Sequence, residues 1–185
     1  MYRWFAISQN KRREKLINIR KNLFETNSSS VHAICWSKNN DWEIPDTLHF
    51  DFGEYGWDNR VLKSTYELAN YLYTALCSIY EGKELSDYKN YIYDTLGRHG
   101  CECTFAKPSI AEWGYFESGY VDHSYELLPF VEFLRTSEKK LLKFLFSPES
   151  FIVTGNDNSD WFYDWLERFE ESEDKKKVEM FVKGN

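Results

Sequence analysis

Two cysteines and two histidines of the sequence could together form a metal centre. If residues 101–105 form a strand, the thiols of Cys101 and Cys103 point to the same face, about 7 Å apart along the chain. Two thiolates so placed can share one zinc ion, and the imidazoles of His32 and His123 would supply the remaining ligands. Four protein ligands leave no open coordination position for a substrate. These residues therefore predict a structural zinc site.

Other assignments of the same side chains stay open. Cys35 or His99 could replace one of the four ligands, depending on whether the segment around each of them is extended. The alternative to a metal site is that the thiols are buried in a core and the histidines lie at the surface. A catalytic alternative is a metal-dependent hydrolase, whose site would lie among His32, Cys103, Asp122 and His123.

The segment 160–174 is acidic and carries aromatic residues at helical spacing. Trp161, Trp165 and Phe169 fall on one stripe of the expected helix, and acidic residues cover its other faces. One interpretation is that this stripe packs on the core. The other is a docking surface, because aromatic anchors inside a polar rim are typical of protein interfaces. On this second interpretation, the partner-binding residues are Asp160, Asp164, Trp165, Glu167, Glu170 and Glu171.

Charge is distributed unevenly along the chain. Residues 1–35 carry seven basic and two acidic side chains, residues 36–174 carry 12 and 27, and residues 175–185 carry four and one. The net charge of −7 thus combines an acidic body with two basic ends. An acidic body argues against direct nucleic-acid binding, which depends on neutralising phosphates. It favours a protein partner with a basic surface.

The sequence offers no sign of a membrane or export segment. No stretch reaches the ~20 apolar residues that cross a bilayer. The first residues are too short and too polar for a signal peptide. We therefore expect a cytoplasmic protein without membrane contact.

The elements that would position these side chains are a mixture of strands and helices. Apolar patterns bounded by turn residues predict strands at 31–36, 48–52, 101–105, 151–153 and 178–182. A capping box begins a helix at Ser64 that Gly82 would end, and helical spacing recurs from Ser86 and at 127–134, 141–146 and 161–169. We expect one α+β domain over residues 19–185, with a small, mostly antiparallel sheet and several packed helices. A basic extension over residues 1–18 would precede it.

Four segments of the chain read as motifs: residues 24–32 (FETNSSSVH), 53–57 (GEYGW), 119–123 (GYVDH) and 151–158 (FIVTGNDN). Together they resemble a family of small proteins of Gram-positive bacteria and their phages, in which the Asn-Ser-Ser-Ser-x-His motif is the most specific. The similarity runs from about Ile19 to Asp160. Some proteins of this kind resemble type II-A anti-CRISPR inhibitors, some of which contain a metal.

The resemblance implies a binding function without catalysis. Inhibitors of that class bind the RNA-guided effector nuclease, which carries a positively charged channel for guide and target. We therefore expect a protein that acts in the bacterial host cell and binds a type II CRISPR effector nuclease through its acidic, aromatic-rich surface. It would act as a monomer or a dimer, with one structural zinc. An interaction adaptor with another partner is the further alternative.

Overall fold

The computed structural model describes residues 30–110 and 116–183. The basic extension expected at residues 1–18 lies outside the described residues. In chain order, the elements are β1 (Ser30–Ser37), β2 (Thr47–Phe50), β3 (Glu54–Tyr55), β4 (Arg60–Leu62), α1 (Thr65–Ile79), α2 (Gly82–Arg98), β5 (Glu102–Phe105), β6 (Tyr120–Val121), the 3-10 helix η1 (Ser124–Leu127), α3 (Leu128–Arg135), α4 (Glu138–Phe146), β7 (Phe151–Asn156), α5 (Asp160–Glu170), α6 (Asp174–Lys177) and β8 (Val178–Lys183). The expected α+β class and single domain are confirmed for the described residues.

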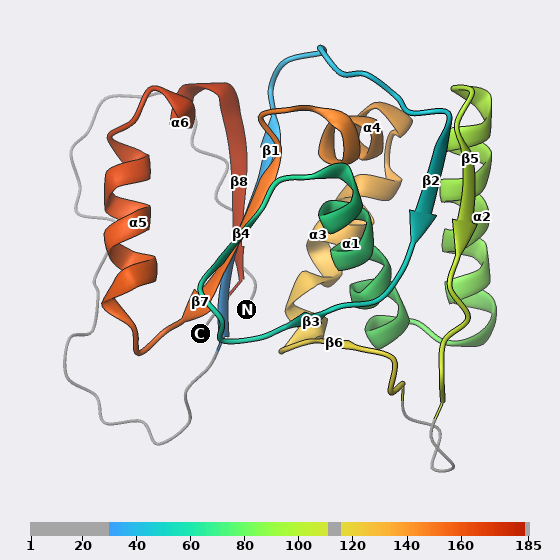
Figure 1. Ribbon diagram of the computed structural model, residues 1–185, viewed down its shortest axis with the longest axis horizontal. Coiled ribbons are helices and arrows are strands. Elements are labelled where there is room, and N and C mark those ends of the chain that lie inside the picture. The colour runs from blue at the N-terminus through green and yellow to red at the C-terminus, as the bar shows by residue number, and fades with distance from the viewer. Residues whose placement is uncertain (1–29, 111–115, 184–185) are drawn as a thin grey trace.

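A four-stranded antiparallel sheet forms the centre of the fold, with the strand order β4-β7-β1-β8. Its register places His32 of β1 opposite Thr154 of β7 on one side and Lys183 of β8 on the other. Figure 1 shows α5 on one side of this sheet and α1, α3 and α4 on the other, with α2 farther out. All eight residues of β1 are buried as a result.

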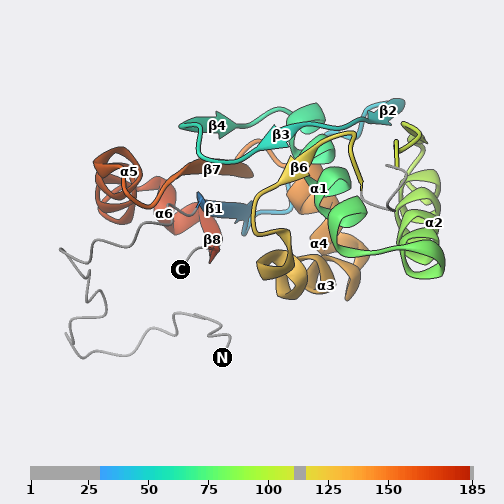
Figure 2. The same cartoon turned by 90° about the horizontal axis from the view of Figure 1, so that it is seen from below.

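Side-chain alternation along β1 divides the apolar residues between two cores. Val31 and Ala33 belong to the core that α5 closes with Phe162. Ile34 and Trp36 belong to the larger core, which is built with the helices of the opposite face. Successive side chains of a strand point to opposite faces, so a strand covered on both sides must be apolar at almost every position. The second view of the chain, Figure 2, shows the same layering.

Helix α1 begins where the sequence predicts. The Ser64 hydroxyl accepts a hydrogen bond from the Glu67 amide, and the Glu67 carboxylate accepts one from the Ser64 amide at 2.9 Å. This reciprocal pair satisfies two amides that a helix start leaves without partners. Most residues of α1 from Leu68 onward are buried, so this helix forms the middle of the larger core.

Several predicted boundaries are wrong: β7 continues to Asn156 and not to residue 153, α1 ends at Ile79 before it reaches Gly82, and two further boundaries have a clear physical cause. The second helix begins at Gly82 and not at Ser86, because the left-handed backbone of Gly82 (φ 52°) turns the chain directly from α1 into α2. The second strand ends at Phe50 and not at residue 52, because the amide of Asp51 leaves the ladder and donates to the side chain of Asn70 at 2.8 Å. The periodicity of the sequence gives no information about either of these last two effects.

Two short parallel strand pairs, β2–β5 and β3–β6, join distant parts of the chain. The two chain segments of the β3–β6 pair approach each other closely at Gly119, just before β6. A Cβ atom at that position would lie 2.5 Å from the carbonyl oxygen of Gly53, so only glycine fits. This pair carries the segment after β6 to the end of the central sheet.

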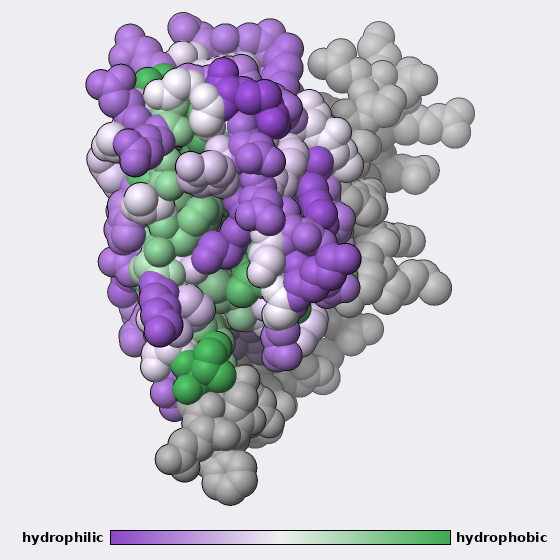
Figure 3. Space-filling view, turned by 90° about the vertical axis from the view of Figure 1, so that its right-hand side faces the viewer, coloured by the Kyte–Doolittle hydropathy of each residue, from purple (hydrophilic) through white to green (hydrophobic). Residues whose placement is uncertain are grey.

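The outer surface mixes polar and apolar regions. Figure 3 shows the side on which α2 lies, where apolar side chains form a band bordered by hydrophilic ones. Among residues 30–110 and 116–183, the helices are all too short or too polar to span a bilayer.

Candidate functional site

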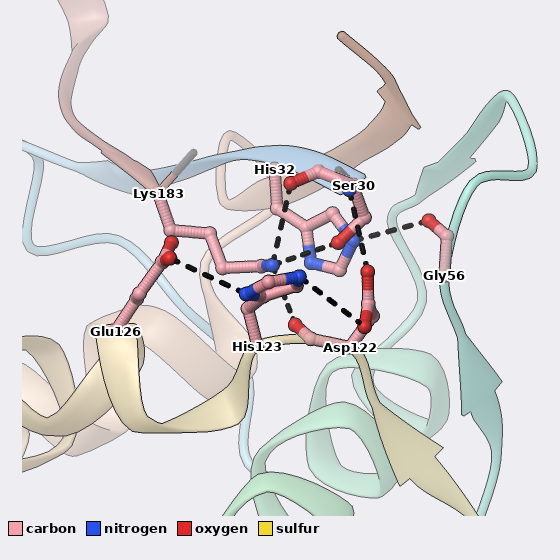
Figure 4. Close-up of polar contacts among 7 residues, drawn as sticks. All are labelled: Ser30, His32, Gly56, Asp122, His123, Glu126 and Lys183. Atoms are coloured by element: carbon pink, nitrogen blue, oxygen red, sulfur yellow. Dashed lines mark hydrogen bonds and ion pairs between the residues drawn. The ribbon is translucent and has the colours of Figure 1, made fainter. Parts of the chain in front are cut away.

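The described residues of the four motif segments meet at one end of the central sheet. Strand β1 pairs with β7, which brings Ser30 opposite Asn156. The amide of Ser30 donates to Asp122 Oδ2 at 3.3 Å, and the imidazole of His32 contacts the carbonyl of Gly56. Each motif therefore contributes a residue to the same region, although up to 92 residues separate the hydrogen-bonded partners. We call the following residues the motif site: Ser30, His32, Gly56, Asp122, His123, Glu126 and Lys183 (Figure 4).

His32 is fully buried in the motif site, and both of its ring nitrogens have partners. Nε2 lies 3.2 Å from the carbonyl oxygen of Gly56, and Nδ1 lies 2.8 Å from the hydroxyl of Tyr71 on α1. Because a carbonyl only accepts, Nε2 must carry the proton and Nδ1 must accept from Tyr71. Burial, with a further effect of the Lys183 charge, lowers the pKa of His32 to about 3. The imidazole is therefore neutral and serves as a structural link between β1, α1 and the 53–57 motif.

Lys183 is the other buried ionisable group of the motif site, with 2% of its surface exposed. Its ammonium donates to Ser30 Oγ at 2.8 Å, to the Ser30 carbonyl at 3.4 Å and to the Asp122 carbonyl. Burial lowers its pKa to about 8, against the opposing effects of the Glu126 and Asp122 carboxylates. Lys183 thus ties the end of β8 to β1 and β6.

Asp122 and His123 lie at the edge of the motif site. Burial tends to raise the pKa of Asp122, but hydrogen bonds from Ser30 and the neighbouring positive groups outweigh this, and the pKa is lowered. His123 adopts a left-handed backbone (φ 50°). This conformation places its exposed ring between two carboxylates, 3.8 Å from Asp122 Oδ1 and 3.7 Å from Glu126 Oε1.

A surface pocket of about 320 Å³ adjoins the motif site. Its lining residues are Gly56, Trp57, Asp58, Tyr120 and Asp122. The two aromatic side chains are unusually exposed, Trp57 by 55% and Tyr120 by 48%. We call this cavity the aromatic pocket. It combines exposed aromatic surface with carboxylates, which is a composition suited to binding a ligand rather than to filling a core.

The predicted zinc ligands are divided between two places. His32 and His123 belong to the motif site, whereas Cys103 lies on β5, paired with Leu48 of β2. Cys101 is buried at the end of α2, where its amide donates to Leu96. Figure 1 shows β5 and β1 on opposite sides of α1. No group of three or more His, Cys, Asp and Glu side chains among the described residues could hold a metal ion.

The chemistry of these side chains also does not fit a zinc site. Burial raises the pKa of Cys103 to about 11, with a smaller effect of Cys101, and burial likewise raises the pKa of Cys101. Raised pKa values favour thiols, whereas zinc binds thiolates. Both nitrogens of His32 are occupied. The reserve ligands do not complete the set, because Cys35 faces the α5 core and His99 lies near Glu138. The zinc prediction therefore gains no support from the geometry, and elemental analysis of the purified protein is its test.

The predicted hydrolase site is assembled only in part. His32, Asp122 and His123 lie together in the motif site, but Cys103 is on the distant β5 (Figures 1 and 4). Lys183 is the residue that sequence reasoning missed. A single lysine in a strand near the end of the described chain forms no motif, and its contact with Ser30 spans 153 residues.

The predicted partner-binding residues lie on α5, except Glu171, which directly follows the helix. Trp165 is half-buried and stacks on Phe169 with ring centroids 5.1 Å apart, while Phe162 of the same helix is fully buried. The aromatic stripe therefore packs on the sheet. The acidic side chains point outward and are exposed: Asp160, Asp164, Glu167, Glu170 and Glu171. Of these, Glu170 forms an ion pair with Lys175.

Comparison with known proteins adds no further assignment. The chain matches no protein-family model, no curated protein and no solved structure. The resemblance carried by the four motifs therefore stays a prediction.

Proposed function

We propose that this protein is an inhibitor that binds an RNA-guided type II CRISPR effector nuclease and acts without chemistry of its own. The observation that carries the proposal is the outward face of α5. Its apolar stripe is held against the sheet, so its exposed acidic side chains form a fixed surface, which we call the acidic face. A fixed acidic surface is complementary to the positively charged channel of such a nuclease.

The arrangement of the motif site favours binding over catalysis. Ser30 and Lys183 are the hydroxyl and amine that could act as nucleophile and base, at a separation of 2.8 Å. They are only 1% and 2% exposed, however, and the lysine ammonium already donates to three oxygens. A substrate would have no access to this pair. The buried network instead stabilises the surface residues around it.

Complex formation tests the proposal. The purified protein is mixed with a guide-loaded type II nuclease, and the mixture is analysed by size-exclusion chromatography and by cleavage of target DNA. We expect the two proteins to co-elute and target cleavage to be lost. An unrelated DNA endonuclease should keep its activity in the same mixture, because the acidic protein does not sequester DNA. Separate elution together with full target cleavage would contradict the proposal.

A further inference from the structure

We propose that the aromatic pocket binds the guanidinium group of an arginine side chain presented by the protein partner. This inference rests on the proposed function for the nature of the partner, and it adds a specific anchoring site. The proposal is based on one cavity, which is lined by two exposed aromatic rings and an ionised carboxylate and lies where the described motif residues meet.

Close packing between Gly56 and Tyr120 positions one aromatic ring of the pocket. Gly56 is buried under the ring of Tyr120, and a Cβ atom at residue 56 would lie 3.2 Å from Cε2 of that ring and 3.3 Å from its hydroxyl. Tyr120 also follows the close contact of the β3–β6 pair, so its backbone position is fixed. Trp57 comes directly after Gly56 and lines the same cavity. Exposed aromatic faces attract cations.

The charges around the pocket favour a cation. Asp58 forms an ion pair with Arg60 at 2.8 Å, so its charge is already compensated. Asp122 accepts a hydrogen bond from the Ser30 amide and lies 3.8 Å from His123, and its partly exposed carboxylate, which its lowered pKa keeps ionised at neutral pH, is the second negative charge of the pocket. Lys183 is buried below, and its ammonium contacts the backbone carbonyl of Asp122. Because the only charged side chains among the described residues that line the pocket are two carboxylates, a phosphate would be disfavoured at this opening.

Arginine fits this combination better than lysine. Its guanidinium is planar, stacks on aromatic rings and offers several N–H donors to one carboxylate, whereas a lysine ammonium is a strongly hydrated point charge. A partner that binds nucleic acid presents arginines on its surface. The pocket is tied to the sheet that α5 covers, because the carbonyl of its lining residue Asp58 accepts a hydrogen bond from the Thr154 hydroxyl of β7 at 2.6 Å. We expect one large partner to contact the acidic face and to fill the pocket as well.

The test uses the full chain and a small probe, so it does not depend on the nuclease. N-acetyl-arginine amide is titrated into ¹⁵N-labelled protein, and the amide signals of Gly56 and Asp58 and the indole signal of Trp57 are followed. We expect saturable shifts confined to these residues, with a Kd of about 1–10 mM, as suits one side chain. The neutral citrulline analogue and the lysine analogue should bind at least roughly tenfold more weakly. Equal binding of citrulline, or no shift with arginine, would overturn the proposal.

Two variants sharpen the result. Trp57→Ala should abolish the amide shifts, whereas Tyr93→Ala, which removes an equally exposed aromatic side chain on α2, should leave them unchanged. Asp122→Asn keeps the shape of the side chain and should weaken arginine binding roughly tenfold. If the probe binds but the nuclease does not, the pocket assignment holds and the proposed function fails. If the nuclease binds equally well to wild type and Trp57→Ala, the arginine site fails and the proposed function stands.

Discussion

His32 and Lys183 lie opposite each other on β1 and β8, and both are buried ionisable side chains. The two side chains offset the free-energy cost of burial in different ways. His32 stays neutral because burial disfavours its charged form, and its two nitrogens are satisfied by one donor and one acceptor. Lys183 surrounds its charge with three oxygen acceptors. Burial of polar groups is tolerated when every donor and acceptor has a partner, so this network fixes the geometry of the residues above it.

The pH dependence of stability should reveal the buried histidine. The pKa of His32 is about 3 in the folded protein and 6.5 in the unfolded chain. Between these values the unfolded chain binds a proton that the folded protein does not. The stabilisation is therefore complete above pH 6.5 and is lost as the pH falls toward 3, by roughly 1.4 kcal/mol per pH unit from this group.

Urea unfolding of the wild type and of His32→Gln across this pH range measures the effect. The variant should be less stable at neutral pH, and its free energy of unfolding should fall less steeply with acid. His49→Gln serves as the control, because His49 is exposed and its removal should leave the slope unchanged. Equal slopes for the wild type and His32→Gln would show that His32 is not buried in its neutral form.

The sequence identifies the titratable motif residues of the site and does not reveal the residues whose role depends on the fold. His32, His123 and Asp122 were all identified as chemically capable. Trp57 and Tyr120 lie within motif segments, but nothing in the sequence distinguished them from the chain's other aromatic residues. Spacing within a strand predicts a shared face for Cys101 and Cys103, but it does not say that β5 lies far from the β1 strand that carries His32. Lys183 is recognisable only from its contacts.

At the scale of elements, local signals were sufficient for most strands and helices. The capping box at Ser64 and the apolar alternation of β1 each depend on neighbouring residues, so they can be read directly from the chain. The parallel pairs β2–β5 and β3–β6 could not be predicted in this way. They join segments more than 50 residues apart, and their strands have only two or four residues each.

The β3–β6 pair allows a direct test of how the site is held. Gly119→Ala would place a Cβ atom 2.5 Å from the Gly53 carbonyl oxygen and force the two strands apart. We expect a loss of roughly 1–3 kcal/mol in the free energy of unfolding. Gly97→Ala is the matched control, because nothing lies within 4 Å of its Cβ position in α2, and it should stabilise by about 0.5–1 kcal/mol. Unfolding in urea gives both values, and equal stability of the two variants would contradict this role of Gly119.

The acidic face of α5 can be tested by removing its charge without changing its packing. The substitutions Asp160→Asn, Asp164→Asn, Glu167→Gln and Glu171→Gln affect only exposed side chains. The Kd for the nuclease should rise roughly tenfold or more at low salt, and the difference from wild type should shrink as salt screens the charges.

Its control carries the same change of net charge on another helix, through Glu81→Gln, Glu84→Gln, Asp87→Asn and Asp94→Asn on and beside α2, where all four are exposed. Binding isotherms at two salt concentrations compare the two variants. If the α5 variant and the α2 variant weaken binding equally, the affinity depends on the net charge of the protein and α5 is not the docking surface.

At the scale of the whole molecule, the acidic composition and the layered fold lead to the same interpretation. Helix α5 covers one face of the sheet and presents carboxylates outward. The aromatic pocket is joined to the same sheet, because Thr154 of β7 donates a hydrogen bond to the carbonyl of its lining residue Asp58. On the proposed function, the molecule thus offers a basic partner two features that are held by one sheet. Such a surface acts by occupancy, so inhibition should follow stoichiometry.

The most direct test of this account is a titration of the protein into a fixed concentration of guide-loaded nuclease, with target cleavage as the readout. We predict that cleavage falls linearly and reaches zero at one or two copies of the protein per nuclease, for a monomer or a dimer. Longer preincubation should not change this end point. If much less than one equivalent of the protein inactivated the nuclease, and the loss of cleavage grew with time, the protein would act catalytically. If target cleavage stayed complete at excess protein, the two proteins would not bind. Either result would contradict the account.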